Sequence, residues 1–450
     1  MELKDLILTP IYLILISLLV YVVKPYVTNK ITKRYFVPAL TLKLLGAIAI
    51  GIIYQFYYSN GVLGGDTSNY YLQAKIIYKA FEQSPTIGLK LLLANGEHDS
   101  TISLYTSSIM WYQAPAEYTV IKFAALFGIF SFNTYTVIGL WFACLSFSGM
   151  WAMYLTFLKI QPNLHKQFAV AVFFLPSVVF WGSGLLKDSL TIGALGWLFY
   201  GFYSFAVEKR AILSSLIISF LAAYIIYTVK VYILLSFLPP ALYWMVMENS
   251  GKIKNRFIRI IAKPVFLILG LYVAYLGATR LTEGDRRYDV NKISERTQIN
   301  SYYLSKQIAS GSAYDIGVFD GSVKSIFIVG PQAIIVALFR PFIWEVRNPV
   351  MLLSALEATI FFYLSVYFML KPGLFRTIKL ISTTPILTFC LIFCLALAFG
   401  VGTNSGNFGT LVRYKIPIMP FFLSALYIIQ GEIAKLKRKS VKQIQKVKFV

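Results

Sequence analysis

The chain has 450 residues, of which 58% are hydrophobic and only 14% are charged, and its formal net charge is +23. This composition excludes an ordinary soluble protein of this size and indicates a polytopic membrane protein. Because a span needs roughly 20 mainly apolar residues, the chain is long enough for many spans in one membrane domain over residues 1–450.

The apolar segments predict an all-α membrane protein with about eleven transmembrane helices. The first segment lacks a basic region before it and a small-residue cleavage site after it, so we expect it to remain as an anchor. The segments lie near residues 6–23, 36–57, 136–158, 167–182, 189–207, 211–229, 231–247, 264–279, 348–370, 380–401 and 416–431.

The basic residues predict the orientation of the chain, because lysines and arginines near span ends are held on the cytoplasmic side. An N-terminus on the outside places about 23 of the 42 basic residues in short inner loops and in a basic cytoplasmic tail, residues 433–450. Charge divided in this way is typical of topology signals and not of a nucleic-acid surface. We expect a multi-pass protein of the cytoplasmic (inner) membrane.

The same orientation leaves two long loops on the outer face, residues 58–135 and 280–347. Loops between spans can be very short, so loops of this length are the candidates for function. The first loop begins with "GVLGGDTSNYYLQAKIIYKAFEQ", whose apolar residues recur at helical spacing from about Thr67. This pattern predicts an amphipathic helix on the membrane surface.

Asp66 stands where the chain leaves the second predicted span, behind two glycines and ahead of Tyr70 and Tyr71. The glycines allow a sharp turn and a close approach, and they keep the carboxylate at the level of lipid headgroups. Asp66 is therefore a candidate catalytic residue, with Tyr70 as a candidate substrate contact. The alternative is that Asp66 is the N-cap of the following helix, and both roles can hold together.

A second polar stretch of the first loop, "NGEHDSTISLYTSS", supplies Glu97 and His98 as candidate substrate-binding residues. It is followed by "WYQAPAEYTVIKFAALFGIFSFN", which predicts another helix on the membrane surface before the third span. The loop is therefore expected to be built from helices lying against the bilayer.

The stretch "LPSVVFWGSGLLKDSL" is the next candidate. Pro176 breaks the fourth predicted span, and glycines follow it before Lys187 and Asp188 at the outer end of the hairpin. An adjacent lysine and aspartate can bind a phosphate or a sugar hydroxyl. The alternative is that they only mark the membrane boundary.

The second loop is mixed in charge and rich in tyrosine and serine, and it ends in "FRPFIWEVRNP". There Arg340, Glu345 and Arg347 gather around Trp344, and a guanidinium can bind a carboxylate or phosphate through two hydrogen bonds. The alternative is an interfacial belt of aromatic and arginine side chains. Glu357 lies deeper, inside the ninth span, where an ionisable group suggests function.

The stretch "GVGTNSGNFGTLVRYKIPIMPFFL" precedes the last span. Its four glycines and two asparagines predict irregular backbone that forms no helix of its own, which is tolerated at membrane depth only against protein or a water-filled cavity. Arg413 and Lys415 follow the glycines as candidate substrate-binding cations.

The order of elements over roughly the first half of the chain resembles the GT-C superfamily of integral membrane glycosyltransferases. The resemblance lies in an outer aspartate after an early span, followed by two surface helices and "APAEYTVIKFAALFGIF". It implies a polyprenyl-phosphate-linked sugar donor, with Asp66 as the base or as the group that holds a metal or the acceptor. In that superfamily the aspartate commonly follows the first span, whereas here it follows the second.

An arginine shortly before a proline-containing final helix is similar to GT-C enzymes and also to polymerases and ligases of the O-antigen type. There arginines bind the lipid pyrophosphate, so this resemblance implies undecaprenyl-type chemistry without separating the classes.

Other chemistries lack their motifs. The chain has no phosphate-binding P-loop, no dinucleotide fingerprint, and only two histidines, His98 and His165, which are too far apart for a usual zinc site. The three cysteines all lie in predicted spans and suggest neither a disulfide framework nor a metal site. A divalent metal is compatible with the site residues, but the sequence does not require one.

The sequence therefore predicts a glycosyltransferase of cell-envelope polysaccharide biosynthesis, with its active site on the outer face. It moves a sugar from a polyprenyl phosphate or pyrophosphate carrier to a saccharide or protein acceptor. The alternatives are a polysaccharide polymerase or O-antigen ligase, and a transporter of lipid-linked saccharides. A transporter is expected to carry ionisable residues within several spans, whereas by sequence Glu357 is nearly alone.

Overall fold

The computed structural model describes residues 3–58, 64–249, 323–347 and 349–448, with isolated positions at 265, 268 and 272. These residues form helices joined by turns, with no strand among them, and eight of their helices are long and apolar enough to cross a membrane. The prediction of an all-helical polytopic membrane protein is confirmed. The number of eleven spans stays a prediction, and most of the span predicted at 264–279 lies outside the described residues.

The chain divides into two compact units. Unit 1 comprises Met1–Thr156, Val172–Gly201 and Ile212–Val231, and unit 2 comprises Phe157–Ala171, Phe202–Ala211 and Tyr232–Val450. The elements that lie mainly in unit 1 are α1 (Leu3–Val27), α2 (Lys33–Ile52), η1 (Ile53–Tyr58), α3 (Gly65–Gln83), α4 (Pro85–Leu93), α5 (Ser103–Thr106), α6 (Pro115–Ile129), α7 (Tyr135–Ile160), α9 (Pro176–Trp181) and α10 (Lys187–Phe202).

The elements that lie mainly in unit 2 include the apolar helices near the C-terminal end of the chain. They are η2 (Pro162–Leu164), α8 (His165–Phe173), η3 (Tyr203–Glu208), α14 (Val323–Phe339), η7 (Ile343–Glu345), α15 (Pro349–Leu370), α16 (Leu374–Thr383), α17 (Pro385–Asn404), α18 (Phe408–Tyr414) and α19 (Ile418–Lys448). Helix α11 (Ile212–Asn249) begins in unit 1 and ends in unit 2.

Pro176 and Lys230 mark two interruptions of the helices in the middle of the chain. The predicted span 167–182 forms two short helices, because Pro176 begins α9 after the end of α8. The predicted spans 211–229 and 231–247 form α11, in which Lys230 has a non-helical backbone at φ −149° and ψ 72°. The boundary expected between these two spans therefore coincides with a break inside α11.

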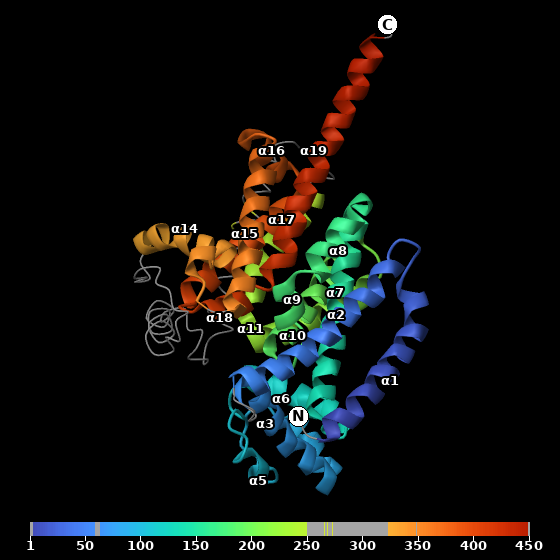
Figure 1. Cartoon of the computed structure of the whole chain (residues 1–450), viewed down its shortest axis with the longest axis vertical. Helices are drawn as coiled ribbons and strands as arrows, with labels where there is room; N and C mark the ends of the chain where they lie inside the picture. The colour runs from blue at the N-terminus through green and yellow to red at the C-terminus, as the bar shows by residue number, and fades with distance from the viewer. Residues whose placement is uncertain are drawn as a thin grey trace. The chain divides into compact units, whose positions relative to one another are not determined.

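The chain between η1 and α7 folds into helices α3 to α6, which share a hydrophobic core with the start of α10. Helix α3 packs against α4 and α6. Figure 1 shows α3, α5 and α6 gathered at the end of unit 1 where the N-terminus of α1 lies. The carboxylate of Asp5 there accepts a hydrogen bond of 2.9 Å from the backbone N–H of Thr136, at the start of α7. The position of these helices on a membrane surface stays a prediction.

Unit 2 contains a helix that the sequence did not indicate. Residues 280–322 of the predicted second loop lie outside the described residues, but residues within 323–339 form α14, which packs closely against α17. Ala333, Val336 and Ala337 of α14 are buried. A Cβ added at Gly402 of α17 would lie 2.1 Å from the carbonyl oxygen of Ala333, so the two backbones touch at this glycine.

The glycine-rich stretch before the last span is also more regular than expected. Helix α17 continues through Gly400 and Gly402 to Asn404, and α18 begins at Phe408, so the prediction that this stretch forms no helix is wrong. The close contact with α14 explains Gly402. The side chain of Asn407 caps α18 by accepting a hydrogen bond from Gly409 N at 2.7 Å.

The two glycines of α17 provide a matched test of this packing. Gly402→Ala should lower the stability of the purified protein, because its methyl group would overlap the Ala333 carbonyl and force α14 away from α17. Gly400 has no atom within 4 Å of an added Cβ, so Gly400→Ala should be neutral or stabilising by up to about 1 kcal/mol. Thermal unfolding of both variants in detergent measures the difference, and equal midpoints would contradict the close contact.

Candidate functional site

Asp66 lies in the first turn of α3 and is not its N-cap. The helix begins at Gly65, and Gly64 occupies the cap position with no side-chain cap hydrogen bond. The carboxylate is half-buried, and the first turn of a helix is where its negative charge is favoured by the helix dipole. The alternative that Asp66 is the N-cap is therefore wrong, and its carboxylate lies in the first turn of α3.

Gly65, the second of the two glycines before Asp66, makes the turn and the close approach that the sequence predicts. Gly65 has φ +72°, a left-handed backbone that L side chains rarely adopt. A Cβ at Gly65 would lie 2.7 Å from the ring of Tyr54 in η1, so the chain passes this ring at contact distance. The ring of Tyr54 in turn meets Trp181 edge-on, with ring centroids 6.4 Å apart. The residue before Asp66 is thus placed against η1, whose Tyr54 also contacts α9.

Helix α3 is held by tyrosines on its buried side. The hydroxyl of Tyr135 donates to Thr67 at 2.8 Å, and the hydroxyl of Tyr71 donates to the carbonyl of Asn133 at 3.1 Å. Tyr70 is only 4% exposed and its ring packs against Trp111, so the structure places this predicted substrate contact in the core. Asp66 therefore starts a helix that these side chains anchor to the core of unit 1.

Glu97 and His98 are exposed in the turn between α4 and α5. Glu97 accepts a hydrogen bond from Asn95 N at 2.6 Å, and backbone hydrogen bonds lower the pKa of its carboxyl below the ordinary value. The hydroxyl of Tyr112 donates to the Glu97 carbonyl at 2.6 Å. These contacts explain Glu97 as a residue that shapes the turn.

Lys187 begins α10 and forms an ion pair with Glu117. The Nζ–Oε1 distance is 2.5 Å, and both side chains are about one-fifth exposed. Glu117 lies in the first turn of α6, so the pair joins the starts of two helices. Glu117 lies in the predicted second surface helix, but it was not among the predicted site residues. An acidic residue in the first turn of an otherwise apolar helix could have indicated it.

Asp188 forms a buried ion pair with Lys230, the residue at the break in α11. Asp188 is 2% exposed and Lys230 is 5% exposed, so both charges have left water and depend on each other. The reading of Lys187 and Asp188 as simple boundary markers does not describe this geometry. A lone lysine in a long apolar stretch was the signal that could have identified Lys230.

Lys43 of α2 is a further buried charge that the sequence analysis missed. Its ammonium donates to the carbonyls of Val178 at 3.0 Å and Gly182 at 2.7 Å, and to the Ser146 hydroxyl at 3.3 Å. Within the described ranges no carboxylate pairs with it. Because carbonyls at a helix end carry partial negative charge, Lys43 holds the end of α9 and the turn that leads to Lys187.

In unit 2 the predicted cluster before α15 forms around Arg340. Its guanidinium donates to both carboxylate oxygens of Glu345, with Nε to Oε2 at 3.0 Å, and lies 5.1 Å from the ring centre of Phe408. Burial raises the pKa of the Glu345 carboxyl, but hydrogen bonds from Arg340 and Phe342 N and the nearby charge of Arg347 bring it below the ordinary value. Arg347 is exposed, and Glu345 occupies the fork of Arg340.

Lys415 follows α18 and connects it to the end of α14. Its ammonium donates to the carbonyl of Arg340 at 3.1 Å, and the side chain is 2% exposed. Burial lowers the pKa of Lys415 to about 8, although the charge of Glu357 acts in the opposite direction. The buried Glu357 is therefore close enough to act on Lys415. Arg413, in the last turn of α18, is half-buried.

The described residues contain no group of three or more His, Cys, Asp or Glu side chains placed to hold a metal ion. Comparisons with known protein families, with curated proteins and with solved structures found no match to the chain. The arrangement of charged side chains is therefore the basis for a functional proposal.

The buried pair in unit 1 predicts a specific mutational result. Asp188→Asn should lower stability by about 3–5 kcal/mol, because it removes the negative charge that faces the buried ammonium of Lys230. The double variant Asp188→Asn with Lys230→Met removes both charges and should recover most of that loss. Yield in the membrane and thermal unfolding measure both effects. A single variant as stable as the parent would mean that the pair does not hold α10 to α11.

Lys415 predicts a pH dependence. Its pKa is about 8 in the folded chain and 10.5 in the reference state, so between these values the unfolded chain binds more protons and stability rises with pH. The parent should gain up to about 1.4 kcal/mol per pH unit relative to Lys415→Met across this window. Thermal unfolding of both proteins from pH 7 to 10 measures the difference, and a constant difference would contradict a depressed pKa.

Proposed function

We propose that the chain is a membrane glycosyltransferase that uses a sugar linked to a polyprenyl phosphate or pyrophosphate. The observation that carries this proposal is the placement of Asp66. Its carboxylate stands at the head of α3, held by the left-handed Gly65 against Tyr54, and α3 shares one hydrophobic core with Leu185 and Leu190, which flank Lys187 and Asp188. A half-buried carboxylate in the first turn of a helix that is packed into the core of unit 1 suits a general base.

In the proposed reaction the hydroxyl of the acceptor attacks the anomeric carbon of the donor sugar. A new C–O bond forms, the bond from that carbon to the carrier phosphate oxygen breaks, and the hydroxyl proton passes to the Asp66 carboxylate. The carrier leaves as a polyprenyl phosphate or pyrophosphate. Cations are needed where its negative charge develops, and Lys187, which lies in the same unit as Asp66, is the proposed contact.

A polymerase or ligase of the O-antigen type is the second candidate. The observation that favours it is the cluster of basic residues in unit 2, where Arg340, Arg347 and Lys415 gather around Glu345 and the Arg340 carbonyl. In such an enzyme the cations that hold the pyrophosphate dominate, and no carboxylate has to act as the base.

The transporter alternative also has an observation in its favour. Glu357 is not nearly alone, because Lys43, Asp188 and Lys230 are also buried in helices with membrane-spanning character. However, Asp188 and Lys230 neutralise each other, and Lys43 is bound to backbone carbonyls at the end of α9. These contacts explain the three charges as fixed supports, so the enzyme remains our proposal.

Asp66→Asn tests the proposal. Asparagine keeps the size of the side chain but cannot take the proton, so the variant should fold normally and lose sugar transfer by at least about 100-fold. Asp99→Asn is the matched control, because Asp99 lies in the same loop and its carboxylate accepts hydrogen bonds from the backbone N–H and the hydroxyl of Thr101. It should transfer at the parental rate.

The donor for this assay is found by mass spectrometry of the lipid-linked saccharide that copurifies with the protein. Parental transfer by Asp66→Asn would refute the role of Asp66. If Arg413→Ala or Arg347→Ala then abolished donor consumption, the polymerase or ligase class would replace the present proposal.

A further inference from the structure

Helix α16 has one side that packs on the rest of unit 2. Thr377 is 1% exposed and its hydroxyl donates to the carbonyl of Met369 at 2.9 Å. Leu380 and Ile381, half-buried, share this side, and the helix packs against α15, α17 and α19. Because this side is fixed, the other two sides of α16 have defined directions.

The second side of α16 is apolar and uncovered. Leu374 and Ile378 are more than half exposed and Phe375 is 90% exposed, and they continue the exposed Leu370 at the end of α15. Adjacent exposed side chains of this size mark an interaction surface. In a polytopic membrane protein the nearest cover for such a surface is lipid.

The third side of α16 is basic. Arg376 and Lys379 are exposed and lie on the same face at i and i+3, and Lys371 stands in the turn before the helix. The sequence contains no acidic residue between Glu357 and Glu432, so no nearby carboxylate in the chain order offsets this charge. The surface is therefore complementary to a negatively charged partner.

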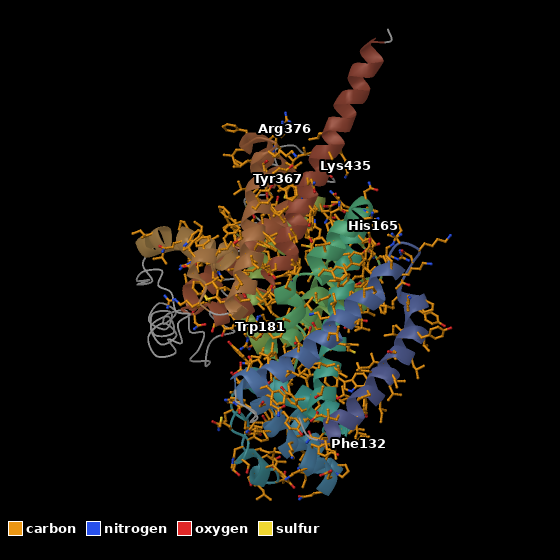
Figure 2. The ribbon with its side chains drawn as sticks, in the orientation of Figure 1. Phe132, His165, Trp181, Tyr367, Arg376 and Lys435 are labelled. Carbon is orange, nitrogen blue, oxygen red and sulfur yellow. The ribbon has the colours of Figure 1, made fainter. Side chains whose placement is uncertain are left out.

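The end of α15 indicates the depth at which α16 lies. Tyr363 and Tyr367 are exposed and their rings stack with centroids 5.9 Å apart. The ammonium of Lys371 lies 4.4 Å from the ring centre of Tyr367 and donates to its hydroxyl. Exposed tyrosine beside lysine at the end of a span is typical of the membrane–water interface. Figure 2 shows Tyr367, Arg376 and Lys435 at the same end of unit 2.

We propose that α16 is a binding site for an anionic phospholipid. Leu374, Phe375 and Ile378 contact the acyl chains, while Lys371, Arg376 and Lys379 contact the headgroup phosphate. A soluble anion would satisfy only the basic side, and a second lipid-exposed helix would satisfy only the apolar side. A phospholipid supplies hydrocarbon and negative charge at adjacent positions, as this surface requires. The site is independent of the proposed sugar transfer.

The test is lipid binding by the full chain in detergent, measured by native mass spectrometry during titration with phosphatidylglycerol or phosphatidylcholine. The parent should bind phosphatidylglycerol more tightly. The variant Arg376→Glu with Lys379→Glu should lose roughly tenfold or more of that affinity, with phosphatidylcholine binding unchanged. The charge-conserving variant Arg376→Lys with Lys379→Arg should keep the preference. Phe375→Ser should weaken the binding of both lipids.

A charge-reversed variant that keeps the parental preference would overturn the proposal and assign the lipid to other basic segments, such as the tail. Equal affinity of the parent for the two lipids would also overturn it. Hydrogen exchange supplies a measurement that needs no variant: phosphatidylglycerol should slow amide exchange in residues 371–384 of the parent more than phosphatidylcholine does. Equal exchange in the two lipids would count against the site.

Discussion

A charge inside an apolar helical protein must be met by other polar groups, and the contacts of Lys43 show how unit 1 satisfies this constraint. One ammonium reaches from α2 to the Val178 and Gly182 carbonyls at the end of α9 and to the Ser146 hydroxyl in α7. An unpaired buried charge would cost several kcal/mol, so these three elements are held together wherever Lys43 remains protonated. The turn that follows Gly182 delivers the chain to α10, and the positions of the later charged residues depend on it.

The charged residues of the two units differ in how they are satisfied. In unit 1 they join helix ends: Lys187 meets the start of α6, and Asp188 meets the break in α11. In unit 2 the main partner lies five residues away in the chain, because Glu345 fills the guanidinium fork of Arg340. The ion pairs of unit 1 hold the start of α10 to α6 and to α11. The arrangement in unit 2 leaves Arg347 as an exposed cation beside a pair that is already neutral.

Hydrophobic segments and local backbone chemistry were readable from the sequence. The helical character of the chain, the break at Pro176 and the need for a glycine before Asp66 all follow from residue type and near neighbours. The missed features depend on contacts distant in the chain. Lys43 and Lys230 meet their partners far along the sequence, and the missing Cβ of Gly402 allows α17 to approach Ala333 of α14 closely. Local glycine content alone therefore suggested irregular backbone where a helix pair is packed.

The adjacent pairs at the start of α10 also restrict rotation of that helix about its own axis. Consecutive residues of an α-helix point about 100° apart, so Lys187 and Asp188 hold α10 from two directions. A turn of the helix in either sense would lengthen one pair or the other. The same angular setting directs Gly193 and Gly196 at α7, where a Cβ on Gly196 would lie 2.0 Å from the carbonyl oxygen of Gly149. The ion pairs of Lys187 and Asp188 at the start of α10 thus favour the rotation of the helix at which Gly193 and Gly196 face α7.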